Sequence, residues 1–256
     1  MSNIAKAFAS GKAFISFITC GDPDLDTTYE IVSAAAEAGA DLIELGIPFS
    51  DPTAEGPVIQ EANLRALEAG TTTDKVFDLV VKLRKTVTVP MVFMTYANVV
   101  FSYGSERFIS RCAEVGIDGL ILPDIPYEEK GEFVDITRRY GIDLVSLIAP
   151  TSEDRISMIA SEAEGFIYVV SSLGVTGVRS SITTDISSLT AKIREVSKVP
   201  CAVGFGISNP KQASDMAQYA DGVIVGSAIM KIVGEYGKDS PSHVAEYVKS
   251  MKDAIR

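Results

Sequence analysis

Two acidic side chains stand where they could transfer protons. Glu44 interrupts a short apolar run over residues 42–47, the pattern of a strand that is buried on both faces. A carboxylate in such surroundings costs several kcal/mol without compensation, so Glu44 is either paired structurally or kept for a reaction. Asp51 and Glu55 follow on a loop rich in turn residues. We expect Glu44 and one of these two loop acids to form a separated proton-transfer pair.

Small residues dominate three loops late in the chain. These loops follow the expected sixth, seventh and eighth strands and comprise residues 173–177, 204–208 and 226–227. Glycine lets backbone N–H groups approach an anion closely, and a helix N-terminus adds a favourable dipole. The pattern predicts a phosphate site that needs no lysine. The alternative is that these glycines only turn the chain.

Several other kinds of site are disfavoured by the residue types at hand. His243 is the only histidine, which argues against a Ser-His-Asp triad and a multi-histidine metal site. No lysine lies within an expected strand, so a Schiff-base aldolase is disfavoured too. We expect no metal, but an oxygen-ligand Mg²⁺ site built from Glu44, Asp51, Glu55 and Asp124 stays as an alternative.

Composition limits the partners and the compartment. The chain has 256 residues, of which 46% are hydrophobic, and a formal net charge of −11. This excess of acids argues against nucleic-acid binding. The three cysteines are widely spaced and form no CxxC pair, which fits a reducing cytosol better than a disulfide framework or a zinc site. With no apolar stretch long enough to span a bilayer, we expect a cytoplasmic protein that does not bind membranes.

Eight short apolar runs alternate with helical segments along the chain. The expected strands cover residues 13–19, 42–47, 90–94, 119–122, 144–149, 166–170, 201–203 and 222–225. The expected helices cover residues 27–37, 58–67, 74–84, 105–115, 128–139, 153–160, 186–196, 210–216, a segment from 227, and 244–255. Tyr96-Ala97-Asn98 is expected to begin a loop.

This alternation predicts a (β/α)8 TIM barrel, formed by residues 1–256 as a single α/β domain with extra N-terminal and loop helices. The alternative is a doubly wound open sheet. Its dinucleotide fingerprint would follow the first strand, where the chain has Gly21-Asp22-Pro23 instead. Asp41 and Asp118 stand at strand starts, on the face of a barrel that serves stability, and we interpret both as structural.

The motifs in these loops resemble those of tryptophan synthase alpha subunits. The resemblance is carried, in the family's order and over nearly the whole chain, by Phe17 to Pro23, Glu44-Leu45-Gly46-Ile47-Pro48-Phe49-Ser50-Asp51-Pro52, Tyr96-Ala97-Asn98, Asp124-Ile125-Pro126, Gly174-Val175-Thr176-Gly177, Gly204-Phe205-Gly206-Ile207-Ser208 and Gly226-Ser227-Ala228-Ile229. It implies a lyase that cleaves indole-3-glycerol phosphate by a retro-aldol step to indole and glyceraldehyde 3-phosphate. It implies no cofactor in this subunit and a pyridoxal-phosphate-dependent beta subunit as partner, in an alpha2-beta2 complex.

The resemblance also implies roles for individual residues. Glu44 would be the general acid and base at indole C3 and the side-chain hydroxyl, and Glu55 would accept the proton of the indole N–H. The implied substrate-binding residues are Phe17, Thr19, Asp22, Met94, Tyr96, Tyr168, Thr176, Gly177, Phe205, Gly206, Gly226 and Ser227. Phe17, Met94, Tyr168 and Phe205 among them would line the indole pocket, whereas Gly177, Phe205, Gly206, Gly226 and Ser227 would surround the phosphate.

Three positions depart from the family's pattern. The family normally has Asp at the position of Glu55, Leu at that of Thr53 and Arg at that of Ser172. The extra methylene of Glu55 displaces a carboxylate by roughly 1.5 Å, and displacements near 1 Å can cost on the order of a hundredfold in rate. Two other readings therefore stand beside the active subunit: a stand-alone lyase, and a catalytically weak alpha-like protein that mainly activates a beta subunit.

Overall fold

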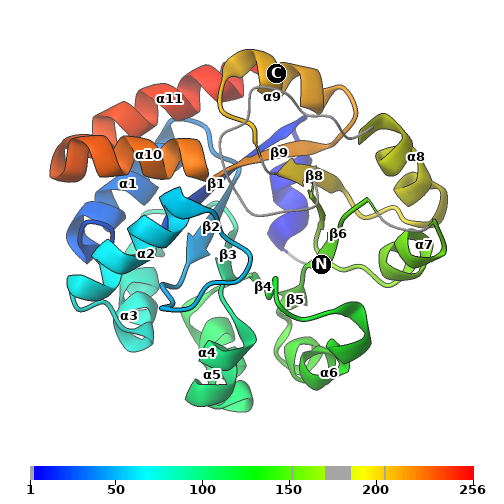
Figure 1. Ribbon diagram of the computed structural model, residues 1–256, viewed down its shortest axis with the longest axis horizontal. Helices are drawn as coiled ribbons and strands as arrows, with labels where there is room; N and C mark the ends of the chain where they lie inside the picture. The colour runs from blue at the N-terminus through cyan, green and yellow to red at the C-terminus, as the bar shows by residue number, and fades with distance from the viewer. Residues whose placement is uncertain (1–2, 151–152, 171–185, 205) are drawn as a thin grey trace.

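The strands form one parallel sheet that is rolled into a barrel. The computed structural model describes residues 3–150, 153–170, 186–204 and 206–256. Within these residues nine strands pair in the order β5-β4-β3-β2-β1-β9-β8-β7-β6, and each strand is parallel to its neighbours in this order. Helices surround the sheet (Figure 1). The strands are β1 (Ala13–Thr19), β2 (Leu42–Gly46), β3 (Met91–Met94), β4 (Gly119–Ile121), β5 (Asp143–Leu144), β6 (Ser146–Ile148), β7 (Ile167–Val170), β8 (Cys201–Gly204) and β9 (Gly222–Val225).

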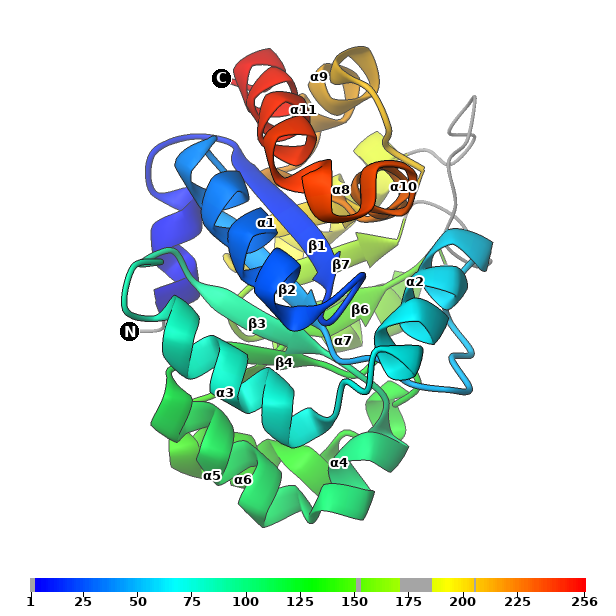
Figure 2. The same cartoon turned by 90° about the vertical axis from the view of Figure 1, so that its left-hand side faces the viewer.

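The helices follow the strands as a (β/α)8 barrel requires. They are α1 (Leu25–Glu37), α2 (Pro57–Glu68), α3 (Thr73–Leu83), α4 (Ala97–Tyr103), α5 (Ser105–Val115), α6 (Gly131–Tyr140), α7 (Glu153–Ser161), α8 (Ile186–Val196), α9 (Pro210–Ala217), α10 (Ser227–Tyr236) and α11 (Ser240–Ala254), with 3-10 turns η1 (Asn3–Phe8), η2 (Tyr127–Glu129) and η3 (Gly237–Asp239). Seen from the side, α1 and α3 cover the outside of β1 to β4 (Figure 2). Among the described helices, none is long and apolar enough to cross a bilayer.

Two short strands, β5 and β6, together occupy the fifth strand position of the barrel. β5 pairs with β4, whereas β6 pairs with β7. Val145 separates the two strands, and its N–H still donates to the carbonyl of Leu120 at 3.0 Å. Because β5 and β6 share one position, the nine strands form an eight-position barrel, which confirms the predicted (β/α)8 fold. The expected single strand over residues 144–149 is wrong in detail, because the chain changes its pairing partner at Val145.

The segment after Tyr96 is a helix rather than the expected loop. Helix α4 begins at Ala97, and Tyr96 provides no side-chain cap. Both carboxylate oxygens of Asp124 instead accept from the N–H of Ala97, each at 3.1 Å. The capping group comes from the loop after β4, so a reading of the local sequence could not find it.

The N-terminal segment closes the end of the barrel at which the strands begin. Ile4 on η1 is fully buried. A Cβ atom on Gly119 would lie 2.9 Å from its Cδ1 atom, and one on Gly165 would lie 3.1 Å from it. The two glycines thus leave the space that Ile4 occupies. The expected extra element at the N-terminus is present.

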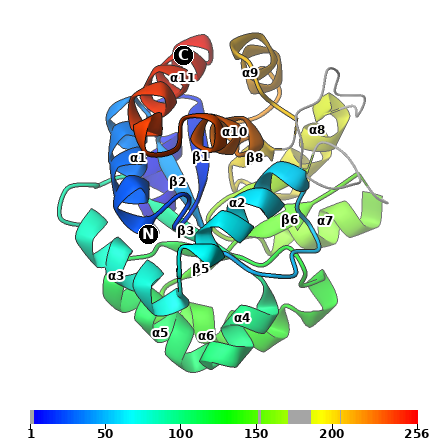
Figure 3. The same ribbon diagram turned by 60° about the vertical axis from the view of Figure 1, so that its left-hand side comes forward.

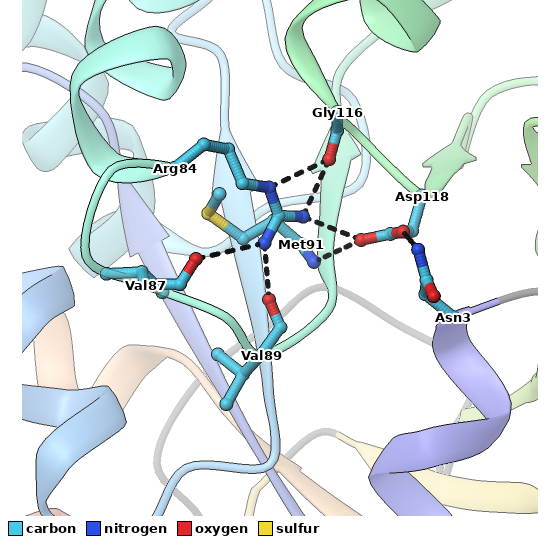
Figure 4. Close-up of polar contacts among 7 residues, drawn as sticks. All are labelled: Asn3, Arg84, Val87, Val89, Met91, Gly116 and Asp118. Carbon is cyan, nitrogen blue, oxygen red and sulfur yellow. Dashed lines mark hydrogen bonds and ion pairs between the residues drawn. The ribbon is translucent and has the colours of Figure 1, made fainter.

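Asp118 joins three elements at this same end of the barrel, where the strands begin (Figure 4). Its carboxylate accepts from Arg84 Nη2 at 2.7 Å, from the N–H of Met91 at 2.9 Å and from Asn3 Nδ2 at 2.9 Å. Arg84 also donates to the carbonyls of residues 87, 89 and 116. The structural interpretation of Asp118 is confirmed.

Asp41 has an equivalent place before β2, which is separated from β4 by β3. Its Oδ2 atom accepts from the N–H of Phe14 at 2.7 Å and from Lys252 Nζ at 2.8 Å. The bond to Phe14 fixes the start of β1, and the bond to Lys252 ties the last helix to the barrel. The structural interpretation of Asp41 is confirmed as well.

We expect Asp118→Asn to lower the free energy of unfolding by about 3 kcal/mol, because removing one partner of a mostly buried pair leaves the other charge uncompensated. Urea denaturation measures the change. Asp26→Asn is the matched control: this residue pairs with Lys82 but its side chain is 92% exposed, so a loss below about 1 kcal/mol is expected. Equal losses in the two variants would contradict the structural role of Asp118.

Candidate active site

A cavity opens at the carboxyl ends of the strands. It encloses about 480 Å³ of empty space including its mouth, a volume that suits a small organic molecule. Its lining comes from five strands, from α2 and the loop before it, from the loop before α9, and from the start of α10 with the residue before it. The lining residues are Phe17, Glu44, Glu55, Ile59, Met94, Tyr168, Gly206, Ile207, Ile224, Gly226 and Ser227.

Strand register brings the apolar lining together. Phe17 on β1 is the register partner of Glu44 on β2, and Met94 on β3 is the partner of Gly46. Register partners on neighbouring strands point to the same face of the sheet, and Phe17 and Glu44 both point into the barrel, where they line the cavity. A Cβ atom on Gly46 would lie 2.7 Å from the Phe17 ring, so the glycine provides room for that ring.

Two further glycines, Gly204 at the end of β8 and Gly226 just after β9, also leave room for aromatic side chains. A Cβ atom on Gly204 would lie 2.5 Å from the Tyr168 ring, and one on Gly226 would lie 3.1 Å from Phe17. These glycines therefore make space for aromatic side chains inside the barrel. For Gly226 this packing stands beside the predicted phosphate contact, since the residue also lines the cavity.

The carboxyl group of Glu44 is buried inside the barrel. Its side chain is fully buried, and neither carboxyl oxygen has a partner among the described residues. Burial, and secondly the charge of Glu55, raises the pKa of Glu44 to about 8. Ionisation is unfavourable there because no donor replaces the lost water. At neutral pH Glu44 carries a proton and can act as an acid.

Glu55 shares the cavity but is held by hydrogen bonds. Asn63 Nδ2 donates to its Oε2 atom at 2.7 Å, and the Tyr96 hydroxyl also bonds its carboxyl group. Burial raises the pKa of Glu55 to about 7, while these two hydrogen bonds act in the opposite direction. Glu55 is therefore partly ionised at neutral pH and can accept a proton.

Of the two loop acids, Glu55 and not Asp51 lies in the cavity. Asp51 is exposed and accepts from the Ser50 hydroxyl. Asp124 caps α4, as described above. These placements separate the four acids of the alternative Mg²⁺ site, and no group of His, Cys, Asp and Glu among the described residues could hold a metal ion.

Three polar residues of the expected binding set do not line the cavity. Thr19 is buried, and its N–H donates to Met230 Sδ at 3.4 Å. Asp22 is fully buried against Arg65. Tyr96 accepts from the N–H of Ala54 at 3.2 Å, which leaves its own proton for Glu55.

Gly206, Gly226 and Ser227 are the small residues of the cavity lining. Gly226 precedes the first turn of α10, a helix of ten residues. Free N–H groups at a helix N-terminus favour an anion. Thr176, Gly177 and Phe205, and the departing position Ser172, lie outside the described residues.

Sequence reasoning did not find Asn63. It lies within α2, on the buried face that also carries Ile59 and Ala62. An asparagine inside a helix is most simply interpreted as a solvated or packing residue, and only the return of α2 over Glu55 reveals its contact. The spacing of eight residues between Glu55 and Asn63 is no recognised signal.

A family model, sequence relatives and solved structures all identify the family of the chain. The family model described as tryptophan synthase alpha chain matches residues 4–256. The tryptophan synthase alpha chain of Lacticaseibacillus casei is 49% identical over 255 residues, covering 100% of this chain and 96% of the relative, and that of Lactiplantibacillus plantarum is 50% identical, covering 100% and 97%. A Mycobacterium tuberculosis tryptophan synthase structure superposes with a TM-score of 0.90 at 31% identity, covering 100% and 98%. The tryptophan synthase complex from Pyrococcus furiosus does so with a TM-score of 0.86 at 34%, covering 95% and 98%. The chain belongs to the tryptophan synthase alpha chain family.

Proposed function

We propose that this enzyme cleaves indole-3-glycerol phosphate to indole and D-glyceraldehyde 3-phosphate, with Glu44 and Glu55 as its catalytic residues. The observation that carries the proposal is the fully buried carboxyl group of Glu44, which no described residue hydrogen-bonds, in the same cavity as Glu55. A neutral acid and a partly ionised base at one pH are what the reaction needs.

The first half of the reaction moves two protons. Protonated Glu44 donates to indole C3, which destroys the aromaticity of the five-membered ring and makes C3 a leaving centre. Ionised Glu55 accepts the proton of the indole N–H, which neutralises the ring. Each acid is then in the opposite protonation state.

The second half returns both protons. Glu44, now a carboxylate, accepts the proton of the side-chain hydroxyl as its oxygen forms the aldehyde carbonyl. The electrons of the broken C–C bond pass into the ring, and Glu55 reprotonates the ring nitrogen. Indole and the aldehyde together contain every atom of the substrate, and the two acids recover their starting states.

The remaining lining suits the two ends of the substrate. Phe17, Met94 and Tyr168 offer apolar surface for the indole ring. Gly206, Gly226 and Ser227 offer backbone N–H groups and a helix N-terminus for the phosphate. Thr176, Gly177 and Phe205 would complete this end, and Thr19, Asp22 and Tyr96 would act from behind the residues that line the cavity.

The subunit needs no cofactor of its own for these steps, because every proton transfer is assigned to a side chain. We propose that indole passes to a pyridoxal-phosphate-containing beta subunit in a cytoplasmic alpha2-beta2 complex. Indole release measured without and with the beta subunit separates three cases: a partner-dependent enzyme, a stand-alone lyase and a weak alpha-like activator. Placement of the Glu55 carboxyl inside the cavity favours an active enzyme.

We expect Glu44→Gln to lower indole release at pH 7 by at least about a hundredfold, because glutamine keeps the shape of the side chain but donates no proton to carbon. The assay measures indole formed from indole-3-glycerol phosphate with the beta subunit present. Glu61→Gln, an exchange on the exposed face of α2, is the matched control and should turn over normally. Turnover of the Glu44 variant at the control's rate would sink the assignment.

We expect the rate of indole release to follow a bell-shaped pH profile. Below about pH 7 Glu55 is protonated and cannot accept a proton, and above about pH 8 Glu44 is ionised and cannot donate one. The maximum therefore lies between these two values, which belong to the pair as a whole. Steady-state rates between about pH 5 and 10 test this. A rate that still increases beyond pH 9 would be incompatible with Glu44 as the acid.

A further inference from the structure

Helix α2 controls the surroundings of Glu55. It lies beside α10 at the open end of the barrel (Figure 3). Ile59 on this helix lines the cavity, and Asn63 holds the Glu55 carboxyl group. Gln60 also donates to the backbone carbonyl of Glu55 at 2.7 Å. A shift of α2 would therefore displace the base.

An ion pair ties α2 to the loop after β1. Arg65 donates from Nε to Asp22 Oδ1 and from Nη2 to Asp22 Oδ2, each at 2.8 Å. Asp22 is fully buried, and the Arg65 side chain is 35% exposed. Two parallel, charge-assisted bonds fix orientation as well as distance. The pair therefore resists both translation and rotation of the helix.

Two glycines let neighbouring elements close around this pair. A Cβ atom on Gly234 of α10 would lie 3.2 Å from Arg65 Nη2, so α10 packs closely against the guanidinium group. Gly21, beside Asp22, has a φ of +89° and packs against Thr71, just beyond the end of α2; a Cβ atom on it would overlap the Thr71 side chain. The pair thus lies where β1, α2 and α10 meet.

We infer that the Asp22–Arg65 pair is a positioning device that holds Asn63, and through it Glu55, in place for the reaction. Neither residue of the pair lines the cavity, so their action is indirect. The apolar side chains on the buried face of α2 include two alanines, Ala62 and Ala66. Small side chains interlock weakly, which leaves the orientation of the helix to the ion pair.

The inference rests on the proposed function, in which Glu55 is the base, and it predicts an effect on the titration of that base. Glu55 is faced by Glu44 on β2, by Tyr96 before α4 and by Asn63 on α2; Asp124 acts on Tyr96, and Glu61 acts on Arg65. The Asn63 bond favours the ionised form of Glu55. Losing that bond moves the acidic limb of the rate profile to higher pH.

The test compares the pH dependence of kcat/KM in Arg65→Met, Asn63→Leu and the double variant with that of the unaltered enzyme. We expect Arg65→Met to lower kcat/KM at pH 7 by about ten- to a hundredfold and to move the acidic limb upward, as Asn63→Leu does. The double variant should show nearly the same kcat/KM and acidic limb as Asn63→Leu alone, because both substitutions act on the same Asn63–Glu55 hydrogen bond. Lys252→Met is the control, since it breaks the Asp41–Lys252 pair at the opposite end of the barrel.

If Arg65→Met behaves like Lys252→Met, with a lower melting temperature but an unchanged acidic limb and kcat, the pair is only structural and the inference is wrong. Additive shifts in the double variant would also overturn it. Should Arg65→Met not fold, Arg65→Lys is judged by the same criteria, because lysine keeps the charge without the two-pronged geometry. Failure of the unaltered enzyme to release indole would refute the proposed function instead.

Discussion

The burial of the Glu44 carboxyl group is the constraint on which the rest of this structure depends. A group that ionises in water is held where no described residue offers it a hydrogen bond. The barrel imposes this state, because β2 is flanked on both sides by paired strands and Phe17, the register partner of Glu44, lines the same cavity. An apolar enclosure with a second carboxyl group nearby keeps Glu44 protonated at neutral pH. The fold thereby converts an ordinary glutamic acid into a usable proton donor.

The two ends of the barrel divide stability from chemistry. At the amino ends of the strands, Asp41 and Asp118 are fully engaged by backbone N–H groups and basic side chains, and Ile4 fills the interior. At the carboxyl ends, Glu44 has no hydrogen-bond partner among the described residues, and Glu55 is held by Asn63 and Tyr96. Asp41 and Asp118 thus stabilise their neighbours, whereas Glu44 and Glu55 face a cavity. This division follows from parallel strands, whose carboxyl ends all meet at one face.

Much of this arrangement could be predicted from the sequence, and the failures have physical causes. Alternating apolar runs and helical segments indicated the barrel, and Glu44 drew attention because a charge stood inside such a run. The start of α4 was missed because its cap, Asp124, lies in another loop. Asn63 was missed because its contact with Glu55 depends on where α2 lies. Contacts that depend on how a helix returns over a loop leave no periodic signal in the chain.

The pH dependence of stability reports on the protonation of the buried Glu44 carboxyl group. The folded enzyme keeps the Glu44 proton up to about pH 8, whereas the ordinary pKa of a glutamic acid is 4.5. Between these values unfolding releases a proton, so the free energy of unfolding falls as pH increases, by about 1.4 kcal/mol per pH unit. Urea denaturation of the unaltered enzyme and of Glu44→Gln at pH 5 and pH 9 measures this. The account predicts that the variant gains several kcal/mol relative to the unaltered enzyme between the two pH values. An unchanged difference would show that the Glu44 carboxyl is solvated or paired, which contradicts the account.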